Sequence, residues 1–292
     1  MVHMRPLESV EKEKLSGYLE EDSGSGDPAS DQIEGDGRAE IMCRGDCVLS
    51  GLEAVEWIFR HLGCSLDFEE GAGSGGIWKA GRVCLVSGGI REMLRGERTA
   101  LNILSRMSGI ASGAREASEI AEKTSPGTRV AGTRKTTPGF SLFEKRALID
   151  GGALPHRMNL SQLAMIKDNH IAALGGDPEG MKKAVEMIRR THGPYMLIEV
   201  EVEDENMAIG AVDAGSDIIM LDNLPPERCR EISEIIRKRS SEWGRAVIIE
   251  ASGGITIDDI PYYAPHVDVI SMGSLTYDYR AVGFSMDLIR SG

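Results

Sequence analysis

The chain has 292 residues, of which 41% are hydrophobic and 27% are charged, as is usual for a soluble globular protein. Its sequence contains no apolar run near the roughly 18 residues that cross a bilayer, and its start lacks the apolar segment of a secretory signal. We therefore expect a cytoplasmic protein without a membrane span. The net charge of −13 argues against nucleic acids and anionic membranes as partners.

The charge is unevenly distributed along the chain. Between Arg95 and His170 there are 12 Lys and Arg residues against 7 Asp and Glu residues, a local charge of +5 that leaves −18 for the rest. A basic region in an acidic protein suggests a small anionic ligand. On the count alone, scattered surface charge explains the pattern equally well.

The first hundred or so residues have the pattern of a small α/β domain. We expect a loop over Glu20–Gly37, strands over Cys43–Leu49 and Ile77–Val86, and a short helix over Ala54–Leu62. A longer helix is predicted over Glu97–Gly109, where apolar residues recur at helical spacing.

Beyond Thr128, apolar runs alternate with amphipathic helices. Helices are expected to begin near Glu179, Glu205 and Pro226. The expected strands are Arg129–Gly132, Ala164–Ile166, Met196–Val202, Ile218–Leu221, Val247–Glu250 and Val267–Ser271. The last four begin 22, 29 and 20 residues apart, the spacing of βα units. Six such strands favour a closed α/β barrel over an open sheet.

Basic side chains follow two of the expected strands, where barrel enzymes carry their reactive groups. Arg134 follows the first strand, Lys167 follows the second, and His156 and Arg157 lie between them. Arginine presents a planar fork that matches a carboxylate, so several forks can orient a dicarboxylate. One such basic residue is usually a surface ion pair, but three of them, Arg134, Arg157 and Lys167, near strand ends favour a ligand site.

Acidic and glycine-rich segments follow the later strands. Glu201 and Asp222 end neighbouring strands and suit Mg²⁺, which takes one or two carboxylates, although a structural carboxylate pair remains an alternative. Ser252-Gly253-Gly254 and Gly273-Ser274 follow the last two strands, where barrels often bind phosphate through backbone N–H groups. The sequence therefore indicates an anionic acid, a metal and a phosphorylated partner.

These segments resemble the quinolinate phosphoribosyltransferase family, the carboxylating nicotinate-nucleotide pyrophosphorylases. The matching segments occur in the family's order and cover most of residues 97–275. They are Glu97–Ala111, Gly132–Gly139, His156-Arg157, Ile166–Ile171, Glu199–Val202, Met220–Asn223 and Glu250–Ile255.

The resemblance implies a type II phosphoribosyltransferase fold. Its N-terminal α/β sandwich would span residues 1–107 and its incomplete, TIM-like α/β barrel residues 108–275, with a C-terminal helix over 276–292 packing back on the sandwich. The implied reaction joins quinolinate and phosphoribosyl pyrophosphate, with Mg²⁺, to give nicotinate mononucleotide, pyrophosphate and CO₂ in NAD biosynthesis.

The resemblance also implies roles for single residues. The groups around quinolinate would be Thr133, Arg134, His156, Arg157 and Lys167, with Arg98 reaching in from the second subunit of a homodimer or of a hexamer (a trimer of dimers). The groups for phosphoribosyl pyrophosphate would be Lys135, Glu201, Asp222, Ser252, Gly253, Gly254, Ser271 and Gly273. Glu201 and Asp222 would hold the metal, and Lys135, Lys167, Glu201 and Asp222 would be catalytic.

The chain departs from the family pattern at two positions near the site. Ser141 stands where the family usually has Arg, and Ala153 stands where it usually has a third glycine. Losing one basic group is expected to weaken anion binding rather than to change the reaction. The segment Glu20–Gly37 also differs from the common pattern.

Other functions stay open from the residues alone. A relative with the same fold would use nicotinate without decarboxylation, or would be the paralogue found in molybdenum operons. An aldolase-like barrel would use Lys167 to form a Schiff base. A non-catalytic sensor of phosphorylated metabolites would bind its ligand without turnover.

Overall fold

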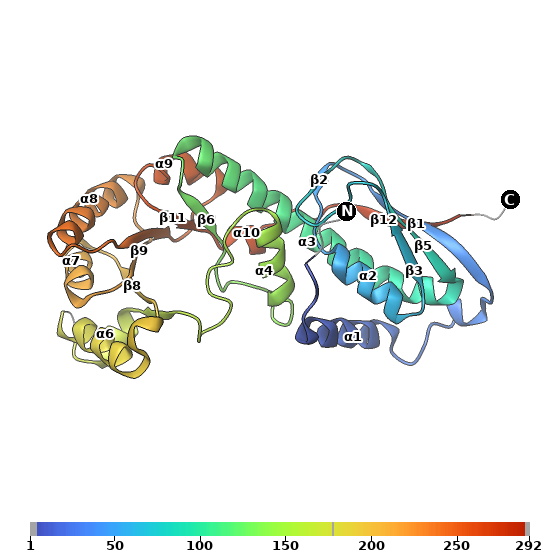
Figure 1. The fold of residues 1–292 in the computed structure, drawn as a ribbon, viewed down its shortest axis with the longest axis horizontal. Coiled ribbons are helices and arrows are strands. Elements are labelled where there is room, and N and C mark those ends of the chain that lie inside the picture. The colour runs from blue at the N-terminus through green and yellow to red at the C-terminus, as the bar shows by residue number, and fades with distance from the viewer. Residues whose placement is uncertain (1–4, 177, 290–292) are drawn as a thin grey trace. The chain divides into compact units, whose positions relative to one another are not determined.

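The computed structural model describes residues 5–176 and 178–289 (Figure 1). The chain divides into two units. The first comprises the chain up to Arg115, the segment Thr136–Gly152 and the chain from Leu275 onward; the second comprises Glu116–Lys135 and Ala153–Ser274. No helix of the described residues is both long and apolar enough to cross a membrane.

The first unit is built on an antiparallel sheet of four strands in the order β12-β1-β5-β3. These strands are β1 (Asp36–Cys43), β3 (Ser65–Phe68), β5 (Gly81–Gly89) and β12 (Phe284–Leu288). Ala39, Ile41 and Cys43 alternate along β1 and are buried, as one face of a strand on a core must be. A separate short ladder joins β2 (Cys47–Val48) to β4 (Ile77–Trp78).

Helices complete the first unit. They are α1 (Ser9–Ser23), the 3₁₀ turn η1 (Ser30–Gln32), α2 (Leu52–His61), α4 (Ser141–Asp150) and the first part of α3 (Ile90–Thr124), with the short α10 (Ser274–Tyr277) at the border of the units. In α2 the residues Leu52, Val55, Ile58 and Phe59 are buried at the spacing of one helix face.

The C-terminal segment is a strand, so the helix expected over residues 276–292 is wrong for the part that the structure describes. β12 pairs antiparallel with β1, with Ala39 opposite Leu288 and Cys43 opposite Phe284. The sequence of β12 alternates apolar Phe284, Met286 and Leu288 with polar residues, which is the period of a strand and not of a helix. Residues 290–292 lie outside the described residues.

Turns and helix ends differ from prediction in the first unit. The strand expected over Cys43–Leu49 is two strands, because the Arg44–Asp46 turn separates β1 from β2. The strand expected over Ile77–Val86 is likewise split, into β4 and β5. The expected loop Glu20–Gly37 contains the end of α1, η1 and the start of β1. The predicted helix over Glu97–Gly109 is part of the longer α3.

The second unit holds a parallel sheet of six strands in the order β6-β11-β10-β9-β8-β7. These strands are β6 (Arg129–Ala131), β7 (Ala164–Ile166), β8 (Ile198–Val202), β9 (Ile218–Asp222), β10 (Ile248–Ser252) and β11 (Val269–Ser271). No ladder joins β6 to β7 among the described residues, so the barrel is incomplete and the closed barrel favoured by the strand count is wrong.

Helices follow most strands of this sheet and lie outside it (Figure 1). They are α5 (Asp168–Ala173), α6 (Glu179–His192), α7 (Glu205–Ala214), α8 (Pro226–Glu242) and α9 (Ile260–Tyr263), with 3₁₀ turns η2 (Gly193–Tyr195) and η3 (Ile257–Asp259). The predicted helix starts at Glu179, Glu205 and Pro226 are confirmed. The six predicted strands are also confirmed to within two residues at each end.

Candidate active site

Strand register brings the predicted acidic residues together at one edge of the sheet. Within β8, Glu199 and Glu201 share a face because alternate residues of a strand point the same way. In the ladders Glu201 lies opposite Met220, and Ser252 lies opposite Asp222. The carboxyl ends of β8, β9 and β10 therefore present Glu201, Asp222 and Ser252 side by side.

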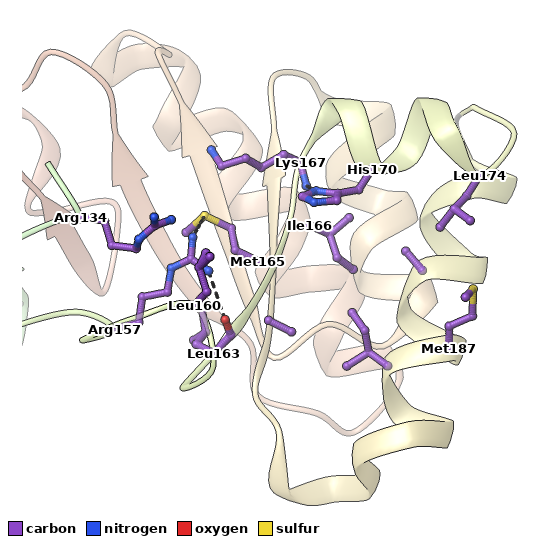
Figure 2. A pocket seen from close by; sticks show the side chains of 13 residues that line it. Arg134, Arg157, Leu160, Leu163, Met165, Ile166, Lys167, His170, Leu174 and Met187 are labelled. Carbon is purple, nitrogen blue, oxygen red and sulfur yellow. Dashed lines mark hydrogen bonds between the residues drawn. The ribbon is translucent and has the colours of Figure 1, made fainter.

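A cavity of about 440 Å³ opens beside this edge, and basic groups line one end of it (Figure 2). Arg134, Arg157, Lys167 and His170 contribute the polar part. Apolar side chains from the β7 region and α6, including Leu163, Met165 and Met187, form the remaining wall. The cavity thus joins positive charge to an apolar surface, as an aromatic acid requires.

The Arg157 guanidinium is fixed by its neighbours. Its Nη1 donates to the carbonyl oxygen of Leu163 at 3.2 Å, and its Nη2 contacts the Met165 sulfur at 3.3 Å. Burial, and then the positive charge of Arg134, lower the pKa of Arg157, while Glu199 opposes this effect. The two guanidiniums lie close enough to repel each other, and binding a dianion between them would reduce this repulsion.

Lys167 lies at the N-terminus of α5 and its Nζ forms a short ion pair with Glu201. The backbone N–H of Lys167 donates to His170 Nδ1 at 3.0 Å, which fixes the start of the helix. An amine that forms a Schiff base must be free to attack a carbonyl, whereas the Lys167 Nζ is engaged by the Glu201 carboxylate. This pairing argues against the aldolase-like alternative.

Asp222 completes a pair of carboxylates suited to a divalent cation. Burial, and then the negative charge of Glu201, raise the pKa of Asp222, which Lys167 opposes. Asn223 Nδ2 donates to Asp222, and Asn223 itself has a left-handed backbone with φ of 55°. Mutually repelling hard oxygen donors at adjacent strand ends match what Mg²⁺ takes from proteins, so these residues fit the expected metal.

The expected phosphate loops lie at the ends of β10 and β11. Gly253 has φ of +103°, and a Cβ there would stand 2.7 Å from the backbone nitrogen of Asn223, so only glycine lets these loops approach. At Gly273 an added Cβ would stand 2.8 Å from Lys135 Cδ, which shows that the Lys135 side chain crosses this glycine. Ser271 is 2% exposed, so its hydroxyl lies inside the unit and not on the loop surface.

A second acidic group lies deeper, and the sequence analysis did not single out its carboxylates. His156 Nε2 stands 3.6 Å from Glu199 Oε2 and 3.4 Å from Glu250 Oε1. Glu199 is completely buried and Glu250 is 3% exposed. Alternation along β8 was the available signal, because Glu199 must share a face with Glu201.

His156 is held through both of its ring nitrogens. Its Nδ1 accepts a hydrogen bond of 2.8 Å from the backbone N–H of Arg157, which places the proton of the neutral ring on Nε2, toward the carboxylates. Burial alone would lower the pKa of His156, but Glu199 and Glu250 outweigh it and raise the pKa to about 9. Protonation of Nδ1 would break the hydrogen bond that Nδ1 accepts from Arg157. This hydrogen bond therefore favours the neutral ring, whereas the two carboxylates favour the charged ring.

The remaining predicted residues are divided between the two units. Thr133 Oγ1 accepts from the backbone N–H of Lys135 at 3.0 Å in the second unit. Arg98 lies on α3 in the first unit, where its side chain is 63% exposed and stands 3.6 Å from Glu97.

The structure shows the surroundings of the two residues that depart from the family pattern, Ser141 and Ala153. Ser141 is the first residue of α4. Ala153 is buried and takes no positive φ, so a side chain is tolerated there, whereas Gly152 has φ of 96°.

The fold and the site define a class: a barrel enzyme that binds a small anionic aromatic acid beside a carboxylate pair. Comparison with known proteins agrees with this class. The family model described as "Quinolinate phosphoribosyl transferase, C-terminal domain" matches residues 110–287, and the corresponding N-terminal domain matches residues 29–108. The chain belongs to the quinolinate phosphoribosyl transferase family.

Individual relatives cover most of the chain. The human protein named "Nicotinate-nucleotide pyrophosphorylase [carboxylating]" is 41% identical over 87% of this chain and 83% of its own length. The Bacillus subtilis protein named "Probable nicotinate-nucleotide pyrophosphorylase [carboxylating]" is 35% identical over 96% of this chain and 94% of its own length. Among solved structures, NadC from Streptococcus pyogenes has a TM-score of 0.87 at 33% identity, covering 98% of this chain and 99% of its own.

Proposed function

We propose that this enzyme transfers the phosphoribosyl group of phosphoribosyl pyrophosphate to the nitrogen of quinolinate, with loss of CO₂. The products are nicotinate mononucleotide and pyrophosphate, an intermediate and by-product of NAD biosynthesis. The observation that carries the proposal is the cavity lined by Arg134, Arg157 and Lys167, of which Lys167 pairs with Glu201, the carboxylate whose charge acts on Asp222.

The basic groups bind and orient the acid. Quinolinate carries two adjacent carboxylates, and the forked guanidiniums of Arg134 and Arg157 suit one carboxylate each. With the carboxylates fixed, the ring nitrogen would face the acidic edge where the sugar would lie. Holding both reactants in this geometry makes the bimolecular reaction effectively unimolecular. The apolar wall near Met165 covers the carbon edge of the ring.

The acidic edge serves the phosphorylated partner. Glu201 and Asp222 would hold Mg²⁺, and this ion, when bound, neutralises the charge that develops on the departing pyrophosphate. Lys135 lies against Gly273 and would donate to the same phosphates, together with backbone N–H groups of Gly253 and Gly254. Glu201 and Asp222 also favour the positive charge that builds on the sugar as its bond to pyrophosphate lengthens.

Decarboxylation needs no further protein nucleophile. Once the ring nitrogen is bonded to the sugar it is cationic, so its charge stabilises the electron pair that stays on the neighbouring ring carbon when the carboxylate departs as CO₂, and that carbon then takes up a proton. The protein's task in this step is to hold the ring and to keep the carbanionic carbon close to a proton source. Lys167, with its ammonium group at the same edge, is positioned to supply charge stabilisation there.

We further propose a homodimer as the smallest active assembly, in a cytoplasmic setting, with a hexamer (a trimer of dimers) as the larger form. The exposed side chain of Arg98 on α3 supports this assembly, because among the described residues its ion-pair contact is with the adjacent Glu97 at 3.6 Å, which leaves the cation available to a second site. Arg98 would then add a further cation to the quinolinate pocket of the partner subunit.

The test is an end-point assay with quinolinate, phosphoribosyl pyrophosphate and Mg²⁺ that follows CO₂ and nicotinate mononucleotide together, with nicotinate as a parallel substrate. Both products from quinolinate are expected. Removing one cation of a buried charge pair costs about 2–5 kcal/mol, so Arg157→Ala should lower kcat/KM for quinolinate by about 30-fold to several thousandfold.

Arg189→Ala is the matched control, because Arg189 pairs with Asp217 at the other end of β9 and should leave turnover unchanged. Product from nicotinate alone would assign the chain to the non-decarboxylating reaction. Unchanged use of quinolinate by Arg157→Ala would overturn the assignment of this pocket.

A further inference from the structure

The backbone of His156 has an uncommon conformation that something must stabilise. Its φ of 55° is left-handed, and among the described residues other than glycine only Asn223 shares this feature. Such a conformation is strained and persists only where surrounding contacts determine it. The side chain of His156 is 10% exposed, so those contacts lie inside the second unit.

The contacts are the two buried carboxylates and the next residue. Nε2 faces Glu199 and Glu250 at 3.6 and 3.4 Å, while Nδ1 accepts from the Arg157 N–H at 2.8 Å. The ring therefore connects the acids on β8 and β10 to the backbone of Arg157. Arg157 in turn places its guanidinium at the cavity through Leu163 and Met165.

The acids themselves have few other contacts. Within the described part of the chain, both oxygens of Glu199 and Oε1 of Glu250 are buried without a hydrogen-bond partner. A buried carboxylate without a partner costs several kcal/mol, so a core that needed only filling would hold apolar residues here. Their neighbours Val200 and Ala251 on the same strands are fully buried and apolar, as ordinary packing predicts.

We propose that Glu199 and Glu250 are positioning residues, whose buried carboxylates face the Nε2–H of His156 as its available acceptors and thereby fix the turn that aims Arg157 into the basic cavity. This inference rests on the proposed function, which identifies the ligand of the cavity as an aromatic dicarboxylate. Neither acid touches the ligand. Each acts through His156, so the loss of either should change affinity for the acid substrate and leave the phosphate side alone.

The test compares steady-state constants for both substrates in four variants. Glu199→Leu and Glu250→Leu remove the acceptor, whereas Glu199→Gln and Glu250→Gln keep the shape and one acceptor oxygen. We expect the leucine variants to raise KM for quinolinate by about 10- to 100-fold, the usual effect of a misplaced binding group. KM for phosphoribosyl pyrophosphate should stay within twofold, and the glutamine variants should recover most of the quinolinate affinity.

The control for losing a buried carboxylate is Glu11→Gln, because Glu11 is 5% exposed and pairs with Arg146 in the first unit. It should leave both KM values unchanged. Equal changes in both KM values, or no change in the quinolinate KM, would overturn the proposal. So would a stoichiometric metal ion in the purified protein that the Glu250→Gln variant lacks, since the cluster would then be a metal site.

A second measurement tests the proposal even if the leucine variants fail to fold. In ¹⁵N-histidine-labelled protein held above the His156 pKa of about 9, where the ring is neutral, His156, identified by the loss of its signals in His156→Gln, should show a proton on Nε2 and none on Nδ1. Its Nε2 resonance should shift in both glutamine variants, and an unchanged resonance would overturn the proposal. If wild-type protein fails to use quinolinate, the proposed function fails, while the state of the His156 ring still tests the positioning contacts.

Discussion

Asp150 offers a quantitative test of how burial couples charge to stability in the first unit. It is the last residue of α4, and its Oδ2 accepts a hydrogen bond of 2.6 Å from Ser50 Oγ. Burial raises the pKa of Asp150 from 3.8 to about 6, even though the Ser50 hydrogen bond acts in the opposite direction. Glu53 adds to the increase, and Arg146 and Arg5 reduce it.

The sign and size of the effect follow from this value. Between pH 3.8 and about 6 the folded protein keeps a proton on Asp150 that the unfolded chain has lost. The contribution to stability is therefore fully present below pH 3.8 and is lost as the pH rises through about 6. A tenfold change in proton affinity is worth about 1.4 kcal/mol, so the loss amounts to about 3 kcal/mol.

The assay is urea denaturation of the wild type and Asp150→Asn from pH 4 to pH 8. Asparagine keeps an acceptor for Ser50 and carries no charge, so the difference between the two proteins isolates this one titration. The wild type should lose about 3 kcal/mol relative to the variant across that range. A difference that stays constant with pH would refute the reasoning.

Asp46→Asn is the control with the opposite sign. The Lys79 hydrogen bond, and then the backbone N–H of Ala80, lower the pKa of the exposed Asp46. Its contribution to stability is therefore present above its unfolded pKa and lost as the pH falls.

Two glycine substitutions test the phosphate loops. In Gly273→Ala the new Cβ meets the flexible Lys135 side chain, which must move away, so KM for phosphoribosyl pyrophosphate should rise by about tenfold in initial-rate assays at saturating quinolinate, with the quinolinate KM unchanged. In Gly253→Ala the obstacle is the backbone of Asn223 and the φ is positive, so we expect about 1–3 kcal/mol of lost stability on denaturation together with a higher KM for phosphoribosyl pyrophosphate. A Gly253→Ala protein as stable as the wild type would contradict the close approach of the two loops.

The barrel could be predicted from the sequence because its strands are short apolar runs of regular spacing. Ile218–Asp222 and Ile248–Ser252 are buried on at least one face and flanked by long amphipathic helices, which is the pattern of a parallel sheet. Once the strands were known, their carboxyl ends identified Lys167, Glu201 and Asp222 without any knowledge of the fold in three dimensions.

Long-range pairing is what the sequence could not supply. The strand Phe284–Leu288 is stabilised by β1, which lies more than two hundred residues earlier in the chain, so only tertiary contact decides its structure. The turn at Arg44–Asp46 was hidden because apolar residues continue on both sides of it. The contacts of Glu199 and Glu250 with His156 depend on where the loop carrying His156 returns to the sheet, which no local sequence pattern encodes.

The inner face of the second unit pairs two of the basic groups that would meet the substrate with acids. Lys167 is paired with Glu201 at the strand ends, and His156 with Glu199 and Glu250 one layer deeper. A pocket built to receive a dianion must otherwise carry unbalanced positive charge when no ligand is bound, and Arg134 and Arg157 already repel each other.

The acids on β8 and β10 offset part of that charge at fixed positions, and Glu199 opposes the lowering of the Arg157 pKa. Two Glu residues spaced by one along β8 can serve both layers, since alternate residues of a strand face the same side. The Glu-Val-Glu sequence of this strand is thus a consequence of strand geometry and of the need to hold two cations at two depths.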